Sequence, residues 1–237
     1  MQTPIKTAAR TAGFLYLINI VFGIFAIGFI SAALVVSNDA TATAKNIINN
    51  ESLYRLGIAA HIIILLTNIP LGVIFYRLFR VINVSLAQML VFFTLVGTSV
   101  EAYNLVNEFA PLIILSGKSY LNNFTQPQLE SIGYVFHPLE GAGFHIALVF
   151  FGFYCITIGY LIYKSRFFPK IPGIMLMIGG TCYLVNSFGT ILSPAFAAKL
   201  VPYILIPSGV AELTFCIYMI IFGVREKIWD EARISAQ

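Results

Sequence analysis

Six long apolar runs separated by short polar segments constrain this chain more than any other feature of its sequence. The runs cover about residues 11–35, 53–77, 86–115, 138–163, 172–193 and 202–224. Each can cross the hydrocarbon of a bilayer as a helix, which needs roughly 20 apolar residues. Isolated strands would leave their backbone groups unpaired in lipid. We therefore predict an all-α integral membrane bundle of six transmembrane helices.

The composition supports the same class. Of the 237 residues, 59% are hydrophobic and only 10% are charged, whereas soluble domains carry about 25% charged residues. Six spans leave room for little else, so we expect a single membrane domain over residues 1–237. The first run is too long for a cleavable signal peptide and is interpreted as the first span.

The basic residues are distributed unequally between the two sides of the predicted bundle. Ten lie at the N-terminus, in the second-to-third and fourth-to-fifth connections and in the C-terminal tail: Lys6, Arg10, Arg77, Arg80, Lys164, Arg166, Lys170, Arg225, Lys227 and Arg233. Four lie on the other side: Lys45, Arg55, Lys118 and Lys199. Cytoplasmic loops are enriched in Lys and Arg, so we expect both termini in the cytoplasm and the protein in the cell (inner) membrane.

Several function classes are disfavoured by what the sequence lacks. No Walker loop, GxGxxG or GxSxG motif occurs in a suitable context. Cys155, Cys182 and Cys216 lie in apolar runs without CxxC spacing and are expected to be buried small side chains. The net charge of +4 is spread over short loops, so we expect no nucleic-acid partner.

Ionisable side chains inside the apolar runs are the candidate functional residues, because a charge at bilayer depth is costly and usually faces the bundle interior or a water-filled cavity. In the third run, Glu101, Asn104 and Glu108 follow i, i+3, i+7 spacing and share one helical face. With the N-terminus inside, most of the set falls in the outer half of the membrane. The predicted ligand-binding residues are His61, Glu101, Asn104, Glu108, His145, Asn186 and Glu212.

Structural roles are the alternative for several of these residues. Asparagines alone suit a hydrogen-bonded seam between helices, whereas two carboxylates on one face favour a function. The fourth run opens with His137, Pro138 and, two residues later, Glu140. Proline suits the first helical position and glutamate the N3 position, so Glu140 also fits a helix cap. His137 also fits a hydrated residue at the membrane interface.

Carboxylates and imidazoles together can also hold a divalent metal such as zinc, manganese or iron. The candidate ligands are Glu108, His137, Glu140 and His145. Di-iron bundles use Glu-x-x-His on two helices, whereas this chain has only the reversed His137-x-x-Glu140, and it has no HExxH motif. No motif implies a cofactor, and a divalent metal stays an alternative to a pocket for a proton, cation or small polar ligand.

Several stretches resemble a large bacterial membrane-protein family catalogued as domain of unknown function 4386. They include AARTAGFLYLINIVFGIF, LYRLGIAAHIIILLTNIPLGVIFYRLFRVINVSLAQ and GFHIALVFFGFYCITIGYLIYKSRFFPKIPGIMLMIGG. The most specific parts are the opening with Arg10, Gly13, Tyr16 and Leu17, and the turn from Lys164 to Gly173. The resemblance covers about Ala8 to Val224. It implies a six-helix bacterial inner-membrane protein and carries no activity or catalytic residue.

The leading hypothesis is a membrane protein that binds or moves a proton, cation or small polar ligand through an acidic pocket in the outer half of the membrane. Glu101 and Glu108 would supply charge, Glu212 the opposing wall, and His145 a proton donor or acceptor near neutral pH. One alternative is an intramembrane, metal-dependent enzyme acting on lipid head groups. The other is a structural or accessory subunit. Enzymatic activity is left open, and a homo-oligomer or a partner membrane subunit is compatible with all three.

Overall fold

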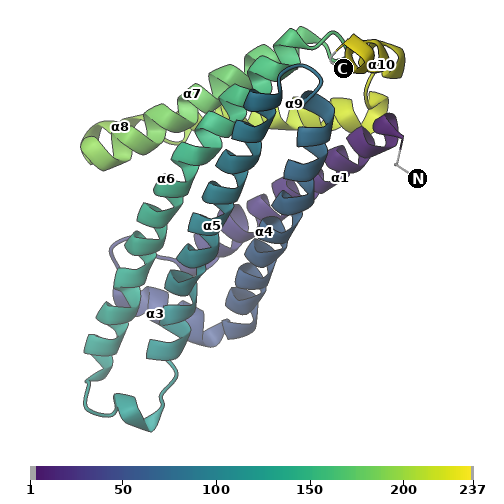
Figure 1. The fold of residues 1–237 in the computed structure, drawn as a ribbon. Coiled ribbons are helices and arrows are strands. Elements are labelled where there is room, and N and C mark those ends of the chain that lie inside the picture. Colours follow the sequence, from purple (N-terminus) through teal and green to yellow (C-terminus); the bar gives the residue numbers. More distant parts are fainter. Residues whose placement is uncertain (1–3, 236–237) are drawn as a thin grey trace.

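The structure, a computed structural model, describes residues 4–235, and its regular elements there are all helices (Figure 1). Six helical segments are long and apolar enough to cross a membrane, which confirms the predicted class. They are the first span, Ile5–Leu34, followed by α4 (Glu51–Phe79), α5 (Val84–Ile114), α6 (Gln126–Lys164), α7 (Lys170–Leu192) and the last span, Tyr203–Phe222.

The first span is not one uniform helix. It begins as α1 (Ile5–Gly23), widens into a π-helical stretch, η1 (Ile24–Ser31), and ends as the short α2 (Ala32–Leu34). Widened helical turns of this kind are frequent at functional sites. The chain then forms α3 (Ala40–Asn49), whose first turn is capped by Asp39 through a hydrogen bond from the Ala42 N–H. A helix of 10 residues is too short to span a bilayer. Helix α3 instead packs beside α6 toward the end of the bundle opposite the chain termini.

The six spans form a closed ring. Each packs against two neighbours: α1 against α4 and α9 (Ile206–Phe222), α5 against α4 and α6, and α7 against α6 and α9. Figure 1 shows both chain termini at one end, here called the terminal end, and α3 toward the other, here called the α3 end. The remaining elements are η2 (Ser119–Leu121), α8 (Pro194–Leu200), η3 (Tyr203–Leu205) and α10 (Glu226–Ser235).

The structure differs from the expected bounds at the fourth span. Helix α6 has 39 residues and begins at Gln126 rather than at Pro138. The reason is local: Thr125 and Gln128 form a reciprocal capping box, and Pro127 stands in the first turn. Pro138 consequently lies inside the helix. The alternative interpretation of Glu140 as a helix cap is therefore corrected, because Glu140 lies well past the first turn.

Small residues set a close contact between two helices of the ring. A Cβ added to Gly159 of α6 would lie 2.6 Å from the carbonyl oxygen of Gly173 on α7, so any side chain there would separate the two helices. Glycine at such crossings lets helix backbones approach closely in lipid.

Aromatic packing fills the terminal end of the bundle. The Phe75 ring centroid lies 6.1 Å from that of Phe215, and the Phe79 centroid lies 6.2 Å from that of Phe167. All four side chains are fully buried. Helix α10 docks beside them, where the indole N–H of Trp229 donates to the Leu78 carbonyl at 3.0 Å. This end is solidly packed, and the open space of the bundle lies elsewhere.

Candidate functional site

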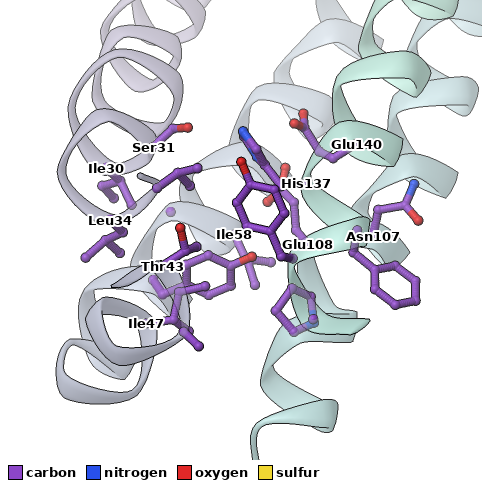
Figure 2. A pocket seen from close by; sticks show the side chains of 18 of the residues that line it. Ile30, Ser31, Leu34, Thr43, Ile47, Ile58, Asn107, Glu108, His137 and Glu140 are labelled. Carbon is purple, nitrogen blue, oxygen red and sulfur yellow. The ribbon is translucent and has the colours of Figure 1, made fainter. Parts of the chain in front are cut away.

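A cavity lies at the α3 end of the bundle. Its walls come from η1 and α2, from α3, from the first turns of α4 and α6, and from the last turns of α5 (Figure 2). The space open to the centres of water-sized molecules is about 100 Å³. One water needs roughly 10–15 Å³ by this measure. The cavity can therefore hold several waters or a small ligand.

His61 stands between two carboxyl groups at the base of this cavity. Its Nδ1 lies 2.7 Å from Oε1 of Glu108, and its Nε2 lies 3.3 Å from Oε2 of Glu101. Both glutamates come from α5, two helical turns apart, and the imidazole enters between them from α4. The His61 and Glu101 residues are 6% and 4% exposed. Neighbouring helices thus hold a carboxyl–imidazole–carboxyl row inside the bundle.

The Glu101 carboxyl group has no hydrogen-bond partner on either oxygen among the described residues. The 3.3 Å approach of His61 is an ion-pair distance without hydrogen-bond geometry. A buried charge without donors is costly, so such a group needs a proton, a cation or bound water. Glu101 is therefore a candidate binding residue at the base of the cavity.

Asn104 joins the glutamate-bearing face of α5 to α6. Its Nδ2 donates to the backbone carbonyl of Glu140 at 2.9 Å, and its Oδ1 accepts from Asn107 Nδ2 at 2.9 Å. This contact depends on Gly143, because a Cβ at that position would collide with the Asn104 amide. Asn104 thus positions Glu140 and Asn107, both of which line the cavity.

The rim of the cavity contains residues that were not selected from the sequence. Glu130 accepts hydrogen bonds from the Thr41 hydroxyl at 2.7 Å and from Gln126 Nε2 at 3.0 Å. The Tyr134 hydroxyl accepts from the Asn38 N–H at 2.8 Å. These contacts attach α3 and its preceding turn to α6. The early start of α6 places Glu130 and Tyr134 in the cavity wall, whereas a start at Pro138 puts both outside the span.

Glu212 lies in a different polar cluster. Its Oε1 accepts from the Tyr183 hydroxyl at 3.0 Å and lies 3.7 Å from Cys155 Sγ, so the cluster is built by α6, α7 and α9. In the described chain Glu212 is not among the residues that line the cavity. The single outer-leaflet site with Glu212 as its opposing wall is therefore not the arrangement observed.

Two other predicted site residues also lie away from the cavity lining. Asn186 is fully buried, and its Oδ1 has no partner among residues 4–235. The Nδ1 of His145 is likewise unpartnered there, and its ring packs edge-on against Phe144 at a centroid distance of 5.8 Å. The structure brings together His61, Glu101, Asn104, Glu108, His137 and Glu140, and leaves His145, Asn186 and Glu212 outside this group.

A hydrogen-bonded chain of uncharged side chains crosses the bundle beside the site. Asn19 Nδ2 donates to Asn68 Oδ1 at 2.7 Å, and Asn68 Nδ2 donates to Thr98 Oγ1 at 3.2 Å. The Thr67 hydroxyl also donates to Asn19. These contacts join the first span, α4 and α5 near the middle of each. They fit the structural role expected of asparagines in membrane helices.

The arrangement of the candidate ligands gives limited support to a divalent metal site. No three His, Cys, Asp or Glu side chains within residues 4–235 are grouped so as to hold a metal ion. Glu101 and Glu108 contact different nitrogens of His61, so they lie on different sides of the ring rather than converging on one point. Of the candidate ligands, Glu108, His137 and Glu140 line the cavity, whereas His145 does not.

Six membrane-length helices in a ring, with carboxyl groups facing an internal cavity, define a multi-pass helical membrane protein. The chain belongs to the family described as domain of unknown function DUF4386, whose sequence profile matches residues 11–223. No curated protein and no solved structure matches the chain. The family assignment agrees with the resemblance found in the sequence and adds no activity.

Proposed function

We propose that this protein binds a small positively charged species, a proton or a cation, in the acidic cavity at its α3 end. The observation that carries the proposal is the row in which His61 stands between Glu101 and Glu108. An imidazole held between two carboxyl groups shares an exchangeable proton with them, and an incoming cation can displace that proton. Helix contacts alone do not require such a row.

The charges around the cavity support a cationic rather than an anionic ligand. Four carboxyl groups line it or lie at its base: Glu101, Glu108, Glu130 and Glu140. Two imidazoles, those of His61 and His137, face them, and no Lys or Arg lines the cavity in the described part of the chain. Carboxylates lining a low-dielectric pocket attract cations and repel anions.

The distribution of basic residues along the chain indicates which side of the membrane the cavity faces. If the basic segments mark the cytoplasm of a bacterial inner membrane, the α3 end faces outward and the cavity receives its ligand from outside. The aromatic packing at the terminal end then separates the cavity from the cytoplasm. Movement of the ligand across the membrane would require that packing to open, as in transporters that expose one site alternately to either side.

Calorimetry on the protein in lipid nanodiscs tests this proposal. Ammonium, Na⁺ and Ca²⁺ are titrated at low ionic strength, and a pH indicator records proton release in weakly buffered solution. We expect one-to-one binding of at least one cation with proton release, weakened at least tenfold in Glu108→Gln. Glu212→Gln, which changes a carboxyl group outside the cavity, is the matched control.

Two results would overturn the proposal. The first is that wild-type protein binds none of these cations and releases no proton. The second is equal binding by the wild type and the Glu108→Gln/Glu140→Gln double variant. Stoichiometric transition metal in protein purified without chelator would instead favour the intramembrane enzyme.

A further inference from the structure

The cavity has two chemically different walls. Figure 2 shows Glu108, Glu140 and Asn107 on the side formed by α5 and α6, whereas Ile30 and Leu34 lie on the opposite side, formed by η1 and α2. On that side α3 contributes Ile47. The carboxyl groups thus face a mainly apolar wall across the cavity, in which Ser31 and Thr43 are the labelled polar residues.

This asymmetry does not suit a bare metal ion. A hard cation such as Ca²⁺ takes six to eight oxygen ligands around it. Here the carboxyl groups stand on one side, and the opposite side offers the hydroxyls of Ser31 and Thr43 among isoleucine and leucine side chains. The Thr43 hydroxyl already donates to the Val36 carbonyl. An ion in that position would lose hydration and gain few ligands on that side.

An organic ammonium ion matches both walls at once. Its N–H groups can donate charge-assisted hydrogen bonds to carboxylates. Its alkyl part can cover the apolar wall, where each buried methylene contributes about 0.8 kcal/mol, or about fourfold in affinity. Tyr54 and Tyr134 also line the cavity, and aromatic rings attract ammonium groups.

The unpartnered oxygens of Glu101 add an independent indication of positive charge at the base. They are buried beneath His61, which contacts Glu101 and itself lines the cavity. A ligand ammonium near Glu108 would compete with the His61 ring for that carboxylate. His61 would then be released toward Glu101, whose oxygens have no other donor among the described residues.

We infer that the ligand of this cavity is a small alkylammonium ion, with its ammonium group at Glu108 and Glu140 and its hydrocarbon against Ile30, Leu34 and Ile47. The inference rests on the proposed function and specifies its ligand class. The space of about 100 Å³ for the centres of water-sized molecules limits the ligand to a short chain.

A chain-length series tests the ligand class. Methyl-, ethyl-, propyl- and butylammonium are titrated by calorimetry into wild-type protein in nanodiscs, with empty nanodiscs to subtract partitioning into lipid and butanol as the uncharged analogue. We expect affinity to rise about fourfold per methylene and then to stop rising when the cavity is full. Butanol should bind at least tenfold more weakly than butylammonium.

Two variants test the contributions of the apolar wall and the acidic wall to binding separately. Ile47→Ser lies on α3, outside the spans, and leaves every carboxyl group in place, so it should reduce the gain in affinity per methylene. Glu108→Gln should weaken all members at least tenfold, and Glu212→Gln none. Size-exclusion elution at the wild-type position shows that each variant is folded.

The outcomes distinguish this inference from the proposed function. Binding of Na⁺ or ammonium with no dependence on chain length would overturn the alkylammonium assignment and leave the cation site standing. Absence of binding by every cation, inorganic or organic, would overturn both. A chain-length dependence that survives unchanged in Ile47→Ser would also contradict the assignment of the apolar wall.

Discussion

Nδ1 of His61 lies 2.7 Å from Oε1 of Glu108, and this contact joins the first half of α4 to the last turns of α5 inside the bundle. The other ring nitrogen faces Glu101, so one imidazole separates a buried carboxyl group from the partly buried carboxyl group of Glu108. His61 should therefore affect both the stability of the α4–α5 contact and the net charge at the base of the cavity.

Removing the imidazole should destabilise the bundle strongly. In His61→Ala, Glu101 and Glu108 would face each other without a partner, and loss of one member of a buried ion pair costs about 3–5 kcal/mol. Unfolding in mixed micelles measures the change. The added Glu108→Gln substitution should recover part of the loss, because it removes one of the carboxylates.

A surface pair supplies the comparison for His61. Glu51 and Arg55 form an ion pair at 2.7 Å with side chains 55% and 56% exposed. Glu51→Ala should change stability by less than about 1 kcal/mol. Equal effects of His61→Ala and Glu51→Ala would contradict the buried row.

A methyl group at Gly143 should disturb the site through Asn104. In Gly143→Ala the new Cβ would collide with the Asn104 amide and break its hydrogen bond to the Glu140 carbonyl. We expect a loss of about 1–3 kcal/mol, as for other overpacked positions, and weaker cation binding. Gly141→Ala is the matched control, because a Cβ there meets nothing within 4 Å. Helix propensity should make this control neutral or slightly stabilising.

Thr41→Val should loosen α3 without touching the base of the cavity. It removes the hydroxyl that donates to Glu130 at 2.7 Å, a loss of about 0.5–1.5 kcal/mol. Hydrogen exchange of residues 40–49 should accelerate, while exchange in α9 stays the same. Thr181→Val serves as the control, since the Thr181 hydroxyl donates to Met177 within its own helix. Unchanged exchange in residues 40–49 would show that this hydrogen bond does not hold α3.

The predicted orientation can be read from thiol accessibility. Ser119→Cys places a thiol in η2 at the α3 end, and Ser235→Cys places one in α10 at the terminal end. With both termini cytoplasmic, a membrane-impermeant maleimide should label the first variant in intact cells and the second only after permeabilisation. The reverse pattern would invert the assigned topology and place the cavity on the cytoplasmic side.

Sequence patterns predicted the spans well and the site only in part. The spacing of Glu101, Asn104 and Glu108 indicated a shared helical face, and all three contribute to the observed row or its support. The same reasoning grouped Glu212 with them by depth. Depth along a helix does not say which way a side chain points around the ring, and Glu212 contacts Tyr183 instead.

The sequence by itself determined the class, because apolar length and the cost of unpaired backbone groups in lipid are properties of each segment alone. Six spanning helices and the polar face of α5 follow from those local terms. The tertiary structure decided which polar groups meet, because helix rotation depends on the packing of whole faces, as at Gly143 and Asn104. Only that packing inserted His61 between Glu101 and Glu108 and opposed the carboxyl groups with a mainly apolar wall.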